Sequence, residues 1–133
     1  MNTNSTTSSL GSNNSEYLRD KVIAFLSDAK AEDVVQINLL GKSSVADFMI
    51  IATGRSQRQV KSISQRIREM FKSNGVREIS VEGEQNSDWI LVDVGDLVIH
   101  LFRPEVREFY NLEKMWSAEM PSDDLSQIEN DGS

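Results

Sequence analysis

The chain has 133 residues, a formal net charge of −7 and no cysteine. Its length predicts a single domain, and the lack of cysteine excludes a disulfide framework, a thiolate zinc site and a thiol nucleophile. The apolar runs are too short to cross a bilayer, and the first residues lack the basic and apolar parts of a signal peptide. We therefore expect a cytoplasmic protein without membrane contact.

The two ends differ in composition from the middle. Residues 1–15 contain no charged side chain, and residues 119–133 contain five acidic and no basic side chains. Neither end has enough apolar surface to offset the entropy of ordering it. We predict a disordered lead over 1–15, a folded domain over 16–118 and an acidic disordered tail over 119–133. Without the five charges of the tail the chain carries only −2, which argues against a surface dominated by phosphate contacts.

The first half of the domain begins with a helix and continues with two strands. Apolar residues recur at helical spacing over residues 16–30, and Ser15 is a candidate cap for the start of this helix. Residues 34–40 have the composition of a strand and residues 41–44 that of a turn. The run 47–52 is almost continuously apolar, which is typical of a strand covered on both faces.

A second helix follows the sequence Thr53-Gly54-Arg55-Ser56. Ser56 can cap its start, and Asn74-Gly75 is a strong stop signal. The glycine turn could hold a phosphate at the helix N-terminus, but it lacks both phosphate-loop signatures, so a plain strand-to-helix turn is favoured. Basic residues cluster on or near this helix and indicate a solvated helix face or, less favoured, a nucleic-acid contact; they are Arg55, Arg58, Lys61, Arg66, Arg68 and Lys72.

The second half of the domain is dominated by strands. Residues 76–82 predict a short strand, and the apolar runs 89–94 and 97–102 flank Gly95-Asp96, which predicts a β-hairpin. Pro104 ends the sheet and suits the first turn of a final helix. The order α-β-β-α-β-β-β-α predicts an α/β fold with a mixed sheet of about five strands flanked by helices.

No set of residues supplies a nucleophile, a base and an oxyanion donor together. Asp93 and Asp96 could form a metal pair, but a spacing of three with a glycine between them places them beside a turn, where Asp96 is expected to bond the local backbone. His100 is the one histidine and lies in an apolar run, so a hydrogen-bonded structural role is favoured over catalysis. Asp47 could likewise be a buried hydrogen-bonding residue. We expect no enzyme activity, no metal and no cofactor.

Trp89 opens a strand directly after a polar loop, where its ring can be half exposed. Trp, Tyr, Met and Arg are enriched at the centres of interfaces, and an ordinary core tryptophan is the alternative. We expect Trp89→Ala to weaken partner binding without unfolding the domain. A second cluster of aromatic and large apolar residues lies at the end of the domain. Some of its members are expected to pack on the core and others to form part of a partner surface; they are Phe109, Tyr110, Leu112, Met115 and Trp116.

Several separated motifs resemble those of the ribosomal silencing factor family, also called Iojap-like or RsfS. In chain order they are residues 46–56, Glu82-Gly83-Glu84, Asp88-Trp89, residues 93–96, residues 98–102 and residues 107–116. The resemblance covers about 17–118. The order of the pieces makes it specific where any one piece would be weak.

The resemblance implies a translational repressor. Members of this family bind the large ribosomal subunit through its protein fourteen, on the face where the small subunit docks, and thereby block subunit joining. Relatives in organelles are linked to assembly of the large subunit. The resemblance also implies a nucleotidyltransferase-like topology without the active site of those enzymes, and a homodimer away from the ribosome.

Carried onto this chain, the resemblance implies partner contacts in the hairpin and in the last segment, at Trp89, Asp93, Asp96, Tyr110, Leu112 and Trp116. Two other classes of protein remain open. One is a large-subunit assembly factor that contacts ribosomal RNA through the basic residues near Arg55, a contact that is secondary in the favoured interpretation. The other is a nucleotidyltransferase-like enzyme, against which the missing carboxylate pair counts.

Overall fold

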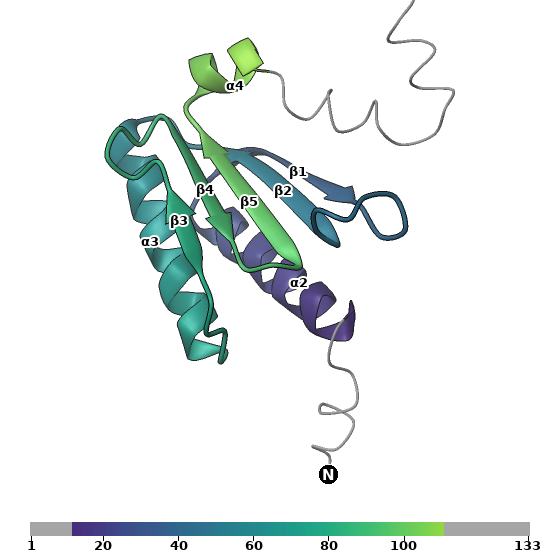
Figure 1. Ribbon diagram of the computed structural model, residues 1–133. Coiled ribbons are helices and arrows are strands. Elements are labelled where there is room, and N and C mark those ends of the chain that lie inside the picture. The colour runs from purple at the N-terminus through teal and green to yellow at the C-terminus, as the bar shows by residue number, and fades with distance from the viewer. Residues whose placement is uncertain (1–11, 111–133) are drawn as a thin grey trace, which may run out of the picture.

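The structure of the protein is a computed structural model that describes residues 12–110 (Figure 1). The order of helices and strands is the predicted one. In chain order the elements are α2 (Ser12–Asp28), β1 (Glu32–Asn38), β2 (Phe48–Thr53), α3 (Gln57–Ser73), β3 (Ser80–Glu82), β4 (Trp89–Asp93), β5 (Leu97–Phe102) and α4 (Pro104–Tyr110).

The five strands form one mixed sheet in the spatial order β1-β2-β5-β4-β3, which confirms the predicted fold class. Strands β2 and β5 pair in parallel, and the other three pairs are antiparallel. A parallel pair needs a long crossover, and α3, β3 and β4 lie within it. The parallel strands β2 and β5 are buried along their whole length, as their continuous apolar runs predict.

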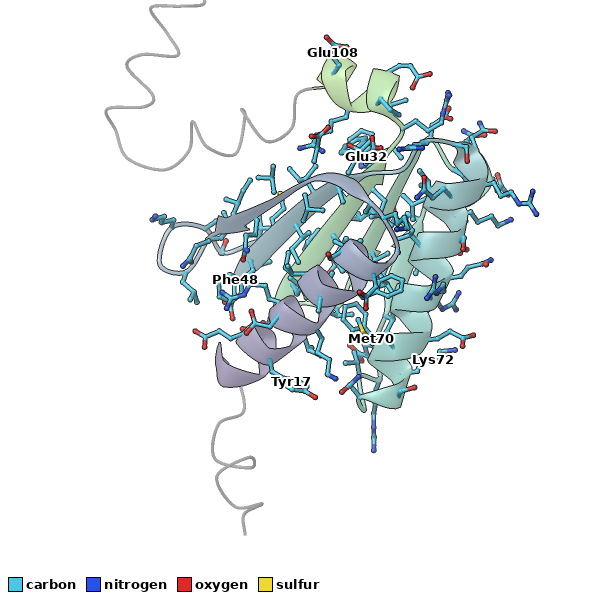
Figure 2. The ribbon with its side chains drawn as sticks, turned by 180° about the vertical axis from the view of Figure 1, so that it is seen from behind. Tyr17, Glu32, Phe48, Met70, Lys72 and Glu108 are labelled. Atoms are coloured by element: carbon cyan, nitrogen blue, oxygen red, sulfur yellow. The ribbon has the colours of Figure 1, made fainter. Side chains whose placement is uncertain are left out.

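Both long helices cover the same face of the sheet, and Figure 2 shows them in front of it when the molecule is seen from behind. Each helix turns one apolar stripe toward the strands, with Leu18, Val22 and Leu26 on α2. The matching stripe on α3 is Val60, Ile63, Ile67 and Phe71. These side chains form the main core with alternate residues of the strands. Burial of this kind supplies about 1.5–3 kcal/mol for each large apolar side chain.

The opposite sheet face carries a second apolar cluster. It is built from Ile37, Leu39, Ala46, Met49, Ile51, Val98 and Phe102, with Val35, Trp89, Leu91 and Val106 packed partly buried around them. Within residues 12–110, neither long helix adds a side chain to this cluster, and α4 lies at the end of β5 (Figure 1). The sheet is therefore covered by helices very unequally on its two faces.

Local signals at three helix ends act as predicted. The Ser56 side chain accepts a hydrogen bond from the Gln59 N–H and caps α3, and Asn74 caps its other end. Gly75 then takes a left-handed conformation with φ +83°, the usual role of glycine after a helix. Pro104 is the first residue of α4.

The start of the first helix was predicted wrongly. Helix α2 begins at Ser12 rather than at residue 16, so Ser15 lies inside the helix and is not its cap. Ser15 is buried, and its hydroxyl donates a hydrogen bond of 3.0 Å to the Asp47 carboxylate before β2. Because this partner lies 32 positions away along the chain, local capping rules could not reveal it. Asp47 is hydrogen-bonded as the sequence predicted, but it is partly rather than fully buried.

The strand predicted over residues 76–82 is shorter in the structure, since only Ser80–Glu82 pair with β4. The Val76 N–H instead bonds the Phe71 carbonyl at the end of α3. Ile79 packs partly buried against the main core. The segment before β3 thus serves the helix end and the core rather than the sheet.

Arg107 ties α4 to the far edge of the sheet. Its guanidinium donates to the Asp33 carbonyl at 2.6 Å and to the Thr53 hydroxyl at 2.7 Å. The carbonyl is presented by a bulge in β1, where Asp33 has φ +50° and the register with β2 shifts. Bulges often redirect backbone groups in this way.

Candidate partner-binding face

The strand register arranges the sheet face opposite α2 and α3 in three rows. The first row runs Thr53, Phe102, Trp89; the second Val35, Ile51, His100, Leu91, Glu82; the third Ile37, Met49, Val98, Asp93, Ser80. We call these residues together the second face. Its centre is apolar and buried, whereas Trp89, Leu91 and Asp93 on β4 keep part of their surface exposed. The second face therefore changes from apolar to polar toward β3.

Trp89 belongs both to the core and to the surface. Its indole N–H donates a hydrogen bond of 2.9 Å to Nδ1 of His100 on the neighbouring strand. Its ring lies 4.8 Å from the Phe102 ring, centre to centre. A half-buried tryptophan fixed in this way presents a rigid edge, which suits an interface anchor. Because of the same contacts, we expect its removal to lower the stability of the folded domain as well.

His100 has the structural role that the sequence predicts. Because Nδ1 accepts from Trp89, the ring carries its own proton on Nε2 when it is neutral. Burial lowers the His100 pKa from 6.5 to about 4, and the nearby Asp93 carboxylate opposes that effect. Protonation at Nδ1 would remove the acceptor of the tryptophan hydrogen bond. The neutral ring is therefore part of the folded structure.

We expect the free energy of unfolding to fall as the pH is lowered from 7 to 5, because of His100. Its folded-state pKa is lower than its unfolded value, so the unfolded chain binds more protons in this window and is favoured by acid. The two pKa values correspond to a loss of about 2 kcal/mol. Urea unfolding at both pH values measures it. A His100→Gln variant should lack this part of the dependence; the same slope in that variant would assign it to other groups.

The hairpin carboxylates have different roles from those predicted. Asp93, not Asp96, bonds the turn, because its carboxylate accepts a hydrogen bond of 2.7 Å from the Gly95 N–H. Asp96 is exposed and contributes its backbone carbonyl, which accepts from the Asp47 and Phe48 N–H groups. Of the two, only Asp93 lies on the second face.

The start of β4 is held by a polar network around Asp88. The Arg103 guanidinium donates to its carboxylate at 2.8 Å, and the Gln57 amide at the start of α3 donates at 3.0 Å. The hydrogen bonds from Gln57 and Arg103 lower the Asp88 pKa below its usual value. The network joins α3, β4 and β5 one residue before Trp89, so it fixes the direction in which the tryptophan leaves the loop.

Gly83 fixes the other side of the same loop. It has φ +92°, and a β-carbon on it would lie 2.1 Å from the Trp89 carbonyl oxygen. The two backbones therefore touch at a point where only glycine fits. Neither this contact nor the partly exposed position of Leu91 on the second face was predicted. The Glu82-Gly83-Glu84 motif marked the position of Gly83 but did not explain why glycine is needed there.

The remaining predicted sites divide between the glycine turn and the last segment. Gly54 lies in a tight strand-to-helix turn, since a β-carbon there would approach Val60 Cγ2 to 2.8 Å, and this supports the turn interpretation. Tyr110 ends α4, and Leu112 and Trp116 lie outside the described residues.

Among residues 12–110, no group of three or more His, Cys, Asp or Glu side chains is placed to hold a metal ion. No helix in that range is long and apolar enough to span a membrane.

These features define a class of protein before any comparison. Two helices pack on one sheet face, and the other face offers a rigid aromatic edge beside an apolar strand. Residues 12–110 thus form a small two-layer α/β domain, with helices packed on one face of a five-stranded mixed sheet.

The comparisons identify the family. A sequence profile described as "Ribosomal silencing factor during starvation" matches residues 12–133. Ribosomal silencing factor RsfS of Zymomonas mobilis is 48% identical over 101 residues, which cover 76% of each chain. The chain belongs to the ribosomal silencing factor family.

A mitochondrial relative and a solved structure extend the comparison. Mouse "Mitochondrial assembly of ribosomal large subunit protein 1" is 33% identical over 112 residues, covering 82% of this chain and 49% of that protein. The crystal structure of a Chromobacterium violaceum protein superposes with a TM-score of 0.74 at 34% identity, covering 80% of this chain and 89% of the other. The fold is therefore shared with a crystal structure as well as with sequences.

Proposed function

We propose that the protein represses translation by binding protein fourteen of the large ribosomal subunit and blocking the approach of the small subunit. The observation that carries the proposal is the second face, where Trp89 and Leu91 keep exposed apolar surface that α2 and α3 leave uncovered. Membership of the silencing factor family supports a ribosomal partner. The mechanism is steric and needs no bond to be made or broken.

The chemistry of this face favours a protein partner. Toward β3 its apolar rows give way to Asp93, Ser80 and Glu82, so hydrogen-bond acceptors and negative charge lie beside the exposed apolar surface of β4. Apolar surface with polar groups beside it is typical of protein interfaces. No basic residue lies in the three rows, so RNA phosphates would find no counter-charge there.

Subunit joining gives the test. Wild-type protein added to large subunits should slow joining with small subunits, measured by light scattering. Leu91→Thr introduces a β-branched residue that suits a strand but removes apolar surface, so about tenfold more protein should be needed for the same effect. Tyr17→Gln removes a 51% exposed aromatic ring on the helix side of the molecule and should leave inhibition unchanged. Equal potency of the two variants would exclude the second face as the docking surface.

A homodimer away from the ribosome belongs to the same proposal. A second copy that covers the apolar rows would compete with protein fourteen, so Leu91→Thr should weaken self-association as well as ribosome binding. Sedimentation equilibrium over a range of concentrations measures this. A dimer that is unaffected by Leu91→Thr would use another surface.

Assembly of the large subunit is the second candidate function. The mouse relative carries assembly in its name, and binding to an immature subunit could use the same face. Depletion of the protein from cells distinguishes assembly from silencing. Accumulation of large-subunit precursors would favour assembly, whereas normal subunits with excess translation under starvation would favour silencing.

A further inference from the structure

Charge is distributed unevenly between α3 and the rest of the described domain. Helix α3 contains five basic residues and one acidic residue, a net charge of +4, whereas residues 12–110 as a whole carry −2. The remainder therefore carries −6. Because the rest of the described domain is acidic, the average composition of the domain does not account for the concentration of basic residues on α3.

Four of the five cations lie along one side of the helix. Arg58, Lys61, Arg68 and Lys72 are spaced by three, seven and four positions, which places them within one longitudinal strip. With Gln65 between them they form what we call the basic stripe. At 1.5 Å per residue the stripe is about 21 Å long. Figure 2 shows Lys72 on the side of α3 that faces away from α2.

The stripe borders Glu69, which lines the same surface as Gln65, Arg68 and Lys72, but its cations are in no salt bridge of the described residues. The salt bridges among residues 12–110 join Arg19, Arg55 and Arg103 to carboxylates, and none involves a cation of the stripe. The fifth cation, Arg66, lies elsewhere, with its guanidinium 4.8 Å from the centre of the Phe25 ring on α2. Arg68 is partly buried, and its Nε has no hydrogen-bond partner.

We infer that the basic stripe binds the phosphate backbone of ribosomal RNA while the second face holds the protein partner. A row of unpaired cations along a straight helix is complementary to a polyanion with regularly spaced charges, and phosphate contacts of this kind need no base recognition. The inference rests on the proposed ribosomal function. It adds a second, electrostatic contact on a different element, which would fix the orientation of the domain on the subunit.

The test compares two triple variants of equal charge. Arg58→Gln/Lys61→Gln/Lys72→Gln neutralises three exposed stripe residues and leaves partly buried Arg68 in place; Lys21→Gln/Lys30→Gln/Lys42→Gln neutralises three exposed cations elsewhere. Binding to large subunits and to RNA extracted from them is measured between low and moderate salt. The slope of log K against log salt should fall by about 2 to 3 in the stripe variant only, since each lost phosphate contact removes about 0.7 to 0.9.

Three controls make the outcome decisive. Circular dichroism must show both triple variants folded, and both should bind isolated large-subunit protein fourteen as wild type does. Equal slopes for the two variants would overturn the inference. Binding of the wild type and the stripe variant to anionic phospholipid vesicles is measured as well. If the stripe variant loses vesicle binding but binds RNA as the wild type does, the inference is overturned in favour of a membrane surface. Failure of wild type to bind isolated protein fourteen, with the RNA result intact, would instead overturn the proposed function.

Discussion

Gly83→Ala should destabilise the protein by about 3 kcal/mol or more. Two costs add at this position. A non-glycine residue at positive φ costs roughly 1–2 kcal/mol, and the β-carbon would lie 2.1 Å from the Trp89 carbonyl oxygen, which forces a backbone shift costing about 1–3 kcal/mol more. Thermal or urea unfolding of the variant measures the sum.

Gly95→Ala is the matched control for this prediction. Gly95 has φ +97°, close to the +92° of Gly83, but nothing lies within 4 Å of its added β-carbon. It should therefore show only the conformational cost, about 1–2 kcal/mol. Equal losses in the two variants would show that the β3–β4 loop yields to the contact and that the close approach to Trp89 is unimportant.

Trp89→Ala should lower both stability and partner affinity, each by about 2 kcal/mol or more. Truncation removes the ring contact with Phe102 and leaves the buried His100 Nδ1 without its donor; an unpaired buried group alone costs about 1–3 kcal/mol. On the partner side, loss of a central tryptophan falls in the usual range for an interface hot spot. Urea unfolding and calorimetric titration measure the two losses separately.

Trp89→Phe separates the two roles of the tryptophan. It keeps an aromatic ring near Phe102 but cannot donate to His100, so it should lose about 1 kcal/mol of stability and retain most of the affinity. If folded Trp89→Ala binds the partner as wild type does, Trp89 is a core residue only, and the docking surface must be sought on another part of the domain.

Local patterns predicted most of the fold. The hairpin follows from two apolar runs around Gly95-Asp96, and both ends of α3 follow from Ser56 and Asn74. These signals act within a few residues, so they can be read before the chain is folded. The role of Ser15 could not be predicted, because its hydroxyl has a partner in a distant segment.

Only the parts of the candidate site that depend on local sequence could be predicted. Trp89 was identified by residue type and position, but its hydrogen bond to His100 depends on the register of two strands. The turn bond of Asp93, assigned from sequence to Asp96, depends on which residue ends β4. Arg107 matched a family motif, yet its purpose needs the β1 bulge that presents the Asp33 carbonyl.

Calorimetric titration of isolated large-subunit protein fourteen tests the central claim most directly. The wild-type protein and Tyr17→Gln should bind it with equal affinity and one-to-one stoichiometry, and Leu91→Thr should bind about tenfold more weakly. Absence of binding by folded wild type would contradict the account. Equal binding by all three proteins would retain the partner but remove the second face as its docking surface.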